Sequence, residues 1–300
     1  MAKTALITGA TGLLGRQVLK VFDRENWNTV GTGFSRAKPP TILKVDLASE
    51  PEVAKALNEY KPQVVIHCAA NRFPDKCDND PEGTRALNIA ASASLAKLCA
   101  EQSIFLVYIS TDYVFPGTEG DAPYETSHTA NPPNLYGETK YEGEKAVLAE
   151  YEKAGKSGLG VVLRVPVLYG EGEPEESAVG VLVKSVWKAQ EKDANIKMDH
   201  WPCAILPIQK IKDPSSLPRV LQFSSEDKFT KYEICQLFAE ILGLPLDGMV
   251  ANTEGNDPNA SVQRPYDCHL STKALKDLGI NVATMDFTGF WKREMRAFRK

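Results

Sequence analysis

The chain has 300 residues, of which 43% are hydrophobic and 25% are charged, and its formal net charge at pH 7 is −4. These proportions are typical of a soluble globular protein and argue against nucleic-acid binding through a basic surface. No apolar run approaches the ~20 residues that cross a bilayer. Six scattered cysteines without a C-x-x-C pair argue against a metal site. We expect a cytoplasmic protein with reduced thiols and no leader segment.

A glycine-rich turn follows the first apolar strand, which we expect at 4–8. Gly9, Gly12 and Gly15 form the pattern G-x-x-G-x-x-G ahead of an amphipathic helix near 12–23. In dinucleotide-binding folds the three glycines permit a tight turn, approach of a pyrophosphate, and close packing of helix on strand. The helix amino terminus adds free N–H groups for the phosphates. The pattern predicts a dinucleotide site, the alternative being a glycine-rich turn without a ligand.

Strand and helix patterns alternate through the first half of the chain. Continuous apolar strands separated by helices predict a parallel sheet covered on both faces, and right-handed crossovers make it a Rossmann-type, doubly wound α/β sheet. After about residue 170 the pattern changes to helices separated by proline-rich stretches, which predicts a smaller lobe at the carboxyl edge of the sheet. We therefore divide the chain into a dinucleotide-binding domain, 1–170, and a substrate or partner lobe, 171–300. The expected elements are strands at 29–34, 42–47, 64–70, 105–111 and 161–169, and helices at 50–60, 81–102, 134–154, 177–191, 230–243 and 271–278.

The end of the second strand indicates which nicotinamide cofactor is preferred. NAD-binding proteins usually place a carboxylate here for the ribose 2′-hydroxyl, but residues 33–38 contain none. Ser35 can donate a hydrogen bond, and Arg36 or Lys38 can pair with a 2′-phosphate. The sequence therefore favours NADP(H) over NAD(H), unless these cations belong to an ordinary solvated turn. Asp46 and Leu47 end the third strand where the adenine would lie, and Cys68, Ala69 and Ala70 are small enough to let the cofactor pass.

A candidate catalytic group lies on the predicted helix 134–154. Tyr136 and Lys140 have the i, i+4 spacing that puts a phenol and an ammonium on one helix face. A cation beside the phenol lowers its pKa, which makes proton exchange possible near neutral pH. Ser110 and Thr111 end the fifth strand and could hydrogen-bond a substrate carbonyl, or they could only cap the strand. His67, inside an apolar strand, is interpreted as a core histidine.

Three motifs together resemble the extended short-chain dehydrogenase/reductases of the NAD-dependent epimerase/dehydratase type. The branch is that of dTDP-4-dehydrorhamnose reductase, with its RmlD-like substrate-binding domain, and within it the chain is similar to the regulatory β subunits of methionine adenosyltransferase. The resemblance covers nearly the whole chain. The three motifs are Thr8–Gly15, Ser110–Phe115 and Asn134–Lys140, and the finer matches include Asn26-Trp27, Glu175–Val179, Met198–Trp201, Thr230–Glu233 and Gln263–Pro265.

The resemblance implies functions for individual residues. The catalytic residues of the reductases correspond to Thr111, Tyr136 and Lys140. The NADP contacts of the family correspond to Thr11, Gly12, Leu13, Leu14, Phe34, Ser35, Arg36, Leu47, Cys68, Tyr136, Lys140 and Leu168.

The resemblance also implies a protein partner. The β subunits bind the catalytic subunit of methionine adenosyltransferase through an inserted carboxyl-terminal tail, and they tune S-adenosylmethionine synthesis. The tail here is 290–300, whose basic sequence with apolar anchors departs from the family pattern. Alternatively, this segment is a solvated terminal helix with two aromatic side chains facing the core.

A second departure lies at 202–212, where the family has a strand and a helix that this sequence does not reproduce. We expect locally poor packing there, with a helix of the lobe missing or malformed.

Three functions compete on this reading. The first is a non-catalytic, NADP-binding regulatory subunit of methionine adenosyltransferase. The second is an NADPH-dependent reductase of a nucleotide-linked 4-keto sugar, which the intact Thr111, Tyr136 and Lys140 favour. The third is a redox-sensing regulator of transcription, against which Tyr136 and Lys140 argue because such proteins often lack this pair.

Overall fold

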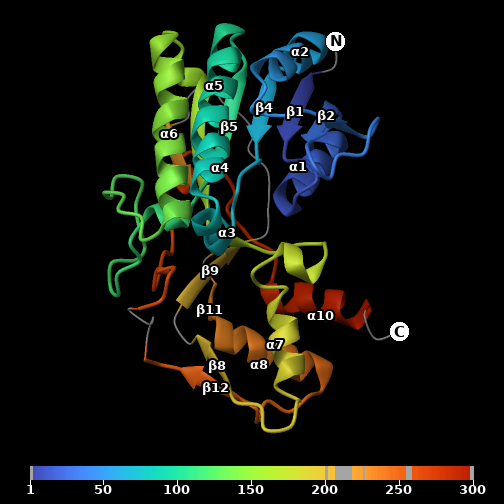
Figure 1. The fold of residues 1–300 in the computed structure, drawn as a ribbon, viewed down its shortest axis with the longest axis vertical. Coiled ribbons are helices and arrows are strands. Elements are labelled where there is room, and N and C mark those ends of the chain that lie inside the picture. Colours follow the sequence, from blue (N-terminus) through green and yellow to red (C-terminus); the bar gives the residue numbers. More distant parts are fainter. Residues whose placement is uncertain (1–2, 200–201, 207–217, 226, 255–258, 298–300) are drawn as a thin grey trace.

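The computed structural model describes residues 3–199, 202–206, 218–225, 227–254 and 259–297 (Figure 1). Its largest element is a seven-stranded sheet with the order β10-β6-β5-β4-β1-β2-β3, in which every pair of neighbours is parallel. The predicted doubly wound sheet is confirmed. Its strands are β1 (Thr4–Thr8), β2 (Asn28–Gly33), β3 (Ile42–Lys44), β4 (Val64–His67), β5 (Phe105–Thr111), β6 (Gly160–Val165) and β10 (Val220–Gln222).

Helices cover both faces of this sheet because its strands carry apolar side chains in both directions. On β5, Leu106 and Tyr108 pack with one set of helices, while Val107 packs on the opposite face. The first face is covered by α2 (Glu50–Tyr60), α5 (Ser92–Glu101) and α6 (Leu135–Lys153), and the second by α1 (Leu13–Arg24) and the short α9 (Lys273–Asp277).

The order of the strands reverses between β1 and β4. From β1 the chain moves outward to β2 and β3, and then returns to the other side of β1 as β4. In open α/β sheets the carboxyl ends of the strands form a crevice at such a point, and ligands bind there. The topology therefore places the glycine-rich turn after β1 and residues 68–72 after β4 at the same crevice.

The predicted helix at 81–102 is three helical segments. It consists of α4 (Pro81–Arg85), a π-helical stretch η1 (Ala86–Ala91) and α5, and it is preceded by α3 (Pro74–Asn79). The π stretch carries Asn88, whose side chain accepts from the N–H of Asn71 at 2.8 Å and donates to the carbonyl of Asn71 at 2.9 Å. Asn88 also donates to Thr139 on α6 at 3.1 Å. The irregular turn thus ties the segment after β4 to α6.

The smaller lobe has its own apolar core below the large sheet (Figure 1). Phe287, Phe290, Trp291 and Met295 of the last helix are buried there against Phe238. The lobe consists of α7 (Leu182–Lys188), α8 (Lys231–Leu242), α10 (Phe287–Ala297), the parallel pair β8 (Ile196–Asp199) and β12 (Met249–Asn252), and the sheet β11 (Lys228–Thr230), β9 (Pro202–Leu206) and β7 (Val167–Leu168).

Two elements cross the predicted boundary at residue 170. β7 belongs to the small sheet, and β10 returns to pair with β6 in the large one. The predicted strand 161–169 is therefore two strands, separated at Pro166, which has no N–H to donate. The division into 1–170 and 171–300 stays a prediction.

The second half differs from the sequence expectations in two further places. The expected helix 177–191 begins only at Leu182, because Ser177 Oγ accepts from the N–H groups of Val179 and Gly180 and forms a local turn instead. In the segment where we expected poor packing, the backbone of Pro202–Leu206 forms β9 between β7 and β11. The rest of that segment, 207–212, lies outside the described residues. No described helix is both long and apolar enough to cross a membrane.

Candidate functional site

A cavity of about 440 Å³ opens at the carboxyl ends of β1, β2, β4, β5 and β6. Apart from Lys38, every residue that the sequence singled out for cofactor binding or catalysis lines it, so the fold brings together seven separate stretches of the chain. Their individual roles stay predictions. These lining residues are Gly9, Thr11, Gly12, Leu13, Leu14, Gly15, Phe34, Ser35, Arg36, Asp46, Leu47, Cys68, Ala69, Thr111, Tyr136, Lys140 and Leu168.

The glycine-rich turn has the geometry that the motif predicts. Gly9 has φ +64°, and a Cβ there would lie 2.8 Å from the backbone nitrogen of Ala69. A Cβ on Gly15 would lie 2.3 Å from the carbonyl oxygen of Gly9. The first glycine therefore permits the turn beside β4, and the third lets α1 pack against the strand.

The start of α1 is suited to an anionic group. Gly12 caps the helix without a side chain, and the first turn contains no acidic residue. The first N–H groups of a helix have no partner within the helix and carry partial positive charge. The residues present therefore fit a pyrophosphate, and Gly12, Leu13 and Leu14 would hold it through the backbone.

The side of the cavity formed by β2 offers a flat ring and a cation. Phe34 is 56% exposed, and Lys44 Nζ lies 5.5 Å from the centroid of its ring. Asp46 accepts a hydrogen bond from the N–H of Ala48 at 2.9 Å, which fixes the turn after β3. Arg36 lines the same wall. This wall therefore offers an aromatic face and cationic side chains to a dinucleotide.

The opposite end of the cavity contains Thr111, Tyr136 and Lys140. Asn134 caps α6 by accepting from the N–H of Gly137 at 3.0 Å, which places Tyr136 in the first turn. Lys140 is buried, and its Nζ lies 3.9 Å from the centroid of the Tyr108 ring. Burial lowers the pKa of Lys140 to about 7, against the opposing effect of the Glu144 carboxylate.

The expectation that the Lys140 ammonium lowers the pKa of Tyr136 is wrong for this structure. Burial raises the pKa of Tyr136 to about 12, while a hydrogen bond with Thr111 opposes the shift. Removal from water disfavours the charged form of Tyr136, and the nearby Arg72 guanidinium, which lowers this pKa, does not reverse the shift. Tyr136 is therefore protonated at neutral pH and can donate a hydrogen bond or a proton.

Two polar groups beside Thr111 also line the cavity. Asp112 is buried, and it accepts a hydrogen bond from the Thr111 hydroxyl at 2.9 Å. Burial raises the pKa of Asp112 to about 7. The hydroxyl of Ser110 is buried and has no hydrogen-bond partner among the described residues. A buried, unpartnered hydroxyl in the cavity wall fits a site that takes a polar ligand. The motif at the end of β5 contained Asp112, but sequence analysis assigned it no role.

His67, by contrast, is a satisfied core residue, as predicted. Its ring nitrogens lie 2.6 Å from the hydroxyl of Thr8 and 2.9 Å from that of Ser92. Burial lowers the pKa of His67 to about 3. The described residues contain no group of three or more His, Cys, Asp or Glu side chains that could hold a metal ion.

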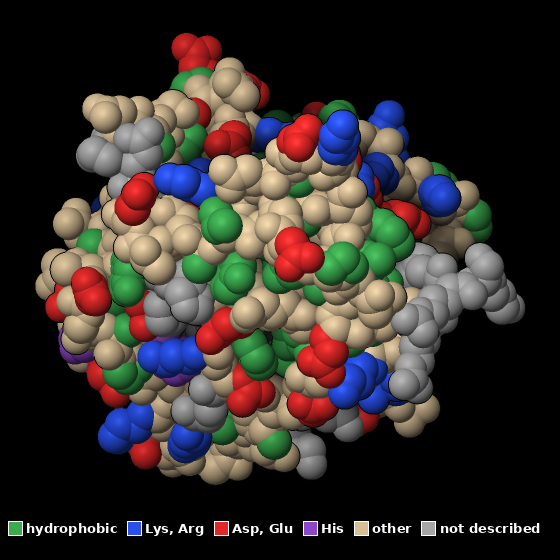
Figure 2. All heavy atoms as spheres, turned by 90° about the horizontal axis from the view of Figure 1, so that it is seen from below, with side chains coloured by type: hydrophobic (Ala, Val, Ile, Leu, Met, Phe, Trp, Pro, Cys, Tyr) green, Lys and Arg blue, Asp and Glu red, His purple; other side chains and the backbone are tan. Residues whose placement is uncertain are grey.

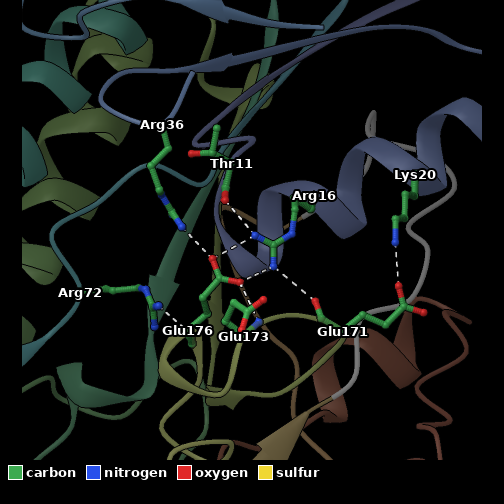
Figure 3. A network of polar contacts seen from close by, with 8 residues as sticks. All are labelled: Thr11, Arg16, Lys20, Arg36, Arg72, Glu171, Glu173 and Glu176. Atoms are coloured by element: carbon green, nitrogen blue, oxygen red, sulfur yellow. Dashed lines mark hydrogen bonds and ion pairs between the residues drawn. The ribbon is translucent and has the colours of Figure 1, made fainter. Parts of the chain in front are cut away.

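Sequence analysis missed a group of charged residues at the edge of the cavity (Figure 3). Arg72, five residues after β4, lines the cavity and donates to the carbonyl oxygen of Glu176 at 2.6 Å. The Glu176 carboxylate accepts from Arg16 at 3.0 and 2.6 Å and from Arg36 at 2.7 Å. Arg72 could have been found by extending the search past β4. Glu176 belongs to the stretch Glu175–Val179 that resembles the family, but no local pattern connects it with the cavity, because it comes from the other half of the chain.

Comparison with known proteins agrees with this architecture. The RmlD substrate binding domain family matches residues 3–288. Methionine adenosyltransferase 2 subunit beta of Mus musculus is 41% identical over 303 residues, covering 96% of this chain and 86% of that protein.

Solved structures show the same fold at lower identity. A dTDP-4-dehydrorhamnose reductase from Clostridium acetobutylicum has a TM-score of 0.78 and 23% identity, covering 99% of this chain and 100% of that one. Another from Bacillus anthracis, solved in complex with NADP, has a TM-score of 0.75 and 20% identity, covering 99% of each chain. The chain therefore belongs to the RmlD substrate binding domain family, in the group that contains the β subunits of methionine adenosyltransferase 2.

Proposed function

We propose that this protein is an NADP-binding regulatory β subunit of methionine adenosyltransferase, which tunes S-adenosylmethionine synthesis in the cytoplasm. The observation that carries the proposal is the 41% identity to a methionine adenosyltransferase 2 subunit beta along 96% of the chain. The cavity at the switch point of the sheet supports the cofactor part of it, since the glycine-rich turn and α1 offer backbone N–H groups to a pyrophosphate.

The preference for NADP(H) over NAD(H) rests on Arg36 and Ser35, which line the β2 wall of the cavity. A guanidinium pairs strongly with a phosphate through charge-assisted hydrogen bonds, whereas a ribose hydroxyl gives it no such partner.

The preference for NADP(H) is tested by calorimetric titration of the wild type and of Arg36→Ala with both dinucleotides. We expect tighter binding of NADP by the wild type and a smaller difference in the variant. Arg85→Ala is the control, because it removes a guanidinium on α4 that pairs with Glu138 and Glu142. It should leave the affinities for both dinucleotides unchanged. Equal affinities in the wild type would refute the preference.

The partner we propose is the catalytic subunit of methionine adenosyltransferase, contacted through residues 290–300. Phe290 and Trp291 are buried in the lobe core, so they are not free to insert into a partner while α10 stays docked. The exposed side chains of Lys292 and Arg293 remain for the contact. Figure 2 shows a face on which hydrophobic side chains are mixed with both signs of charge. Four large apolar side chains exposed on or beside the lobe add surface suited to a protein partner. They are Val181, Trp187, Val250 and Met285.

A pull-down with a purified catalytic subunit tests the partner. We expect the wild type to be retained and the double variant Lys292→Glu/Arg293→Glu to bind more weakly. Glu191→Lys, on the surface beyond α7, serves as the charge-changing control. Failure of the wild type to bind would contradict the regulatory proposal. Normal binding by the double variant would show that the contact does not involve the charged face of α10.

A second candidate is an NADPH-dependent reductase acting on a nucleotide-linked keto sugar. It is favoured by Thr111, Tyr136 and Lys140 lining one cavity, with Tyr136 held protonated by burial. In this role Tyr136 donates the proton to the substrate carbonyl oxygen while bound NADPH supplies the hydride. Purified protein with dTDP-4-dehydrorhamnose should oxidise NADPH, and Tyr136→Phe should abolish the oxidation. No oxidation by the wild type would eliminate this candidate.

A further inference from the structure

Glu176 lies where the two halves of the chain meet, at the edge of the dinucleotide cavity (Figure 3). It belongs to the short 3-10 helix η4 (Pro174–Glu176), which leads through residues 177–181 into α7. Its carboxylate is held by Arg16 of α1 and by Arg36 after β2, while Arg72 holds its backbone carbonyl. We call these four residues the Glu176 cluster.

The two guanidinium groups hold the carboxylate with different strength. Arg16 makes two hydrogen bonds to the carboxylate and further bonds to the carbonyl oxygens of Thr11 at 2.9 Å and Glu171 at 3.3 Å. Arg36 makes one bond to Glu176, and its side chain is 58% exposed, compared with 31% for Arg16. Exposed ion pairs contribute little, so the bond to Arg36 is the one that exchanges easily.

Glu176 keeps its charge over the whole useful pH range. Hydrogen bonds from Arg16, and then from Arg36, lower the pKa of Glu176 to about 2 although burial opposes the shift. The carboxylate is therefore a permanent anion beside the cation that we assign to the 2′-phosphate of NADP. A phosphate monoester carries more negative charge than a carboxylate and offers three acceptor oxygens.

We propose that Glu176 is a specificity-determining residue that competes with the 2′-phosphate for Arg36. NADP takes Arg36 from Glu176, whereas NAD has only a hydroxyl at this position and leaves the pair in place. This inference rests on the proposed binding of a dinucleotide. It has a structural consequence, because Arg36 is one of the links between the large sheet and the segment 171–181. NADP therefore loosens that segment and NAD does not, which transmits the identity of the cofactor to the smaller lobe.

The first test measures both dinucleotides by calorimetry on the full chain with Glu176→Gln. Without the competing charge, we expect NADP to bind about two- to fivefold more tightly, because one exposed ion pair no longer has to be broken. The affinity for NAD should stay the same. Glu175→Gln is the matched control, because it removes the same charge from the neighbouring residue, which pairs with Lys184 and not with Arg36. Equal changes for the two dinucleotides, or weaker binding of NADP, would overturn the inference.

The second test uses the wild type and needs no variant to fold. Hydrogen exchange of residues 171–181 should increase when NADP or adenosine 2′,5′-bisphosphate is added, and it should not increase with NAD or adenosine 5′-monophosphate. Protection of the segment by NADP, or the same response to both dinucleotides, contradicts the competition while leaving the cofactor assignment intact. If the wild type binds neither dinucleotide, the cofactor assignment and this inference are both wrong.

Discussion

At the scale of single residues, position 9 requires glycine for two reasons, its backbone conformation and the lack of space for a Cβ. The two can be separated by experiment. The φ of +64° at Gly9 is unfavourable for other residues, and a Cβ would also collide with Ala69. Gly155 has φ +67° and open space around it, so it shares only the first requirement. We expect Gly155→Ala to lower the free energy of unfolding by about 1–2 kcal/mol. Gly9→Ala should lower it further and abolish dinucleotide binding, as measured by urea denaturation and calorimetry. Equal losses in the two variants would show that contact with Ala69 has no effect.

Asp112, in the wall of the cavity, makes the folding stability of the protein depend on pH. Burial raises the pKa of Asp112 to about 7, from about 3.9 in an unfolded chain. Its contribution to stability is therefore fully present below pH 4 and is lost as the pH rises to about 7. His67 acts in the opposite direction, since burial lowers its pKa to about 3 and its contribution grows as the pH rises from about 3 to 6.5. The two effects oppose each other in the wild type.

The variant Asp112→Asn isolates the carboxyl group from this balance. We expect its free energy of unfolding, relative to the wild type, to increase by about 1.4 kcal/mol for each pH unit between about 4 and 7. Urea denaturation at several pH values measures the difference. Asp78→Asn, which changes an exposed carboxylate on α3, is the control. Parallel stability curves for Asp112→Asn and the wild type would contradict the prediction.

At the scale of elements, a buried ion pair joins α6 to β6. Arg164 donates to the two carboxylate oxygens of Glu144 at 2.9 and 2.7 Å, and the two side chains are 5% and 3% exposed. Removing one partner of such a pair strongly destabilises the fold, because the other charge is then buried alone. The pair lies one turn beyond Lys140, and the Glu144 carboxylate opposes the lowering of the Lys140 pKa. The packing of α6 and the charge of the cavity are therefore coupled.

We expect Glu144→Gln to lower the free energy of unfolding by about 3–5 kcal/mol. The double variant Glu144→Gln/Arg164→Met should recover part of this loss, because it removes the isolated guanidinium. Glu150→Gln on the same helix breaks an exposed pair with Lys153 and should cost less than about 1 kcal/mol. Thermal and urea unfolding measure all three, and similar losses for Glu144→Gln and Glu150→Gln would disprove the role of burial.

The elements were predictable where local pattern alone determines them. The bounds of β5 and of α2 agree with the sequence expectation, since an apolar run and an amphipathic repeat define them locally. The π stretch within 86–91 was not predictable, because it depends on Asn88 meeting Asn71 and Thr139. The late start of α7 likewise follows from the turn at Ser177, whose hydroxyl donates to the carbonyl of Leu168 at 2.9 Å.

At the scale of the whole molecule, the candidate site was likewise predictable where local patterns define it and not where it depends on distant contacts. The glycine-rich turn, the end of β5 and the Tyr136–Lys140 spacing are local patterns, and the parallel sheet brings the ends of its strands to one edge. Glu176 lies 140 positions from Arg36 in the sequence, and only the fold brings its carboxylate to the residues of that edge. The pKa direction of Tyr136 was also missed, since burial in the cavity is a property of the assembled fold.

The outer strand of the large sheet has a consequence for synthesis of the chain. β10 pairs with β6 through Val162, Leu163 and Arg164, and Leu221 is completely buried. A strand edge without its neighbour is a template for pairing with other chains. A nascent chain that has reached only residue 170 therefore carries β6 as an open, apolar edge, and the ribosome must deliver residues 220–222 before the edge is sealed. Release of a prematurely terminated product would accordingly yield an aggregating fragment rather than a free nucleotide-binding module.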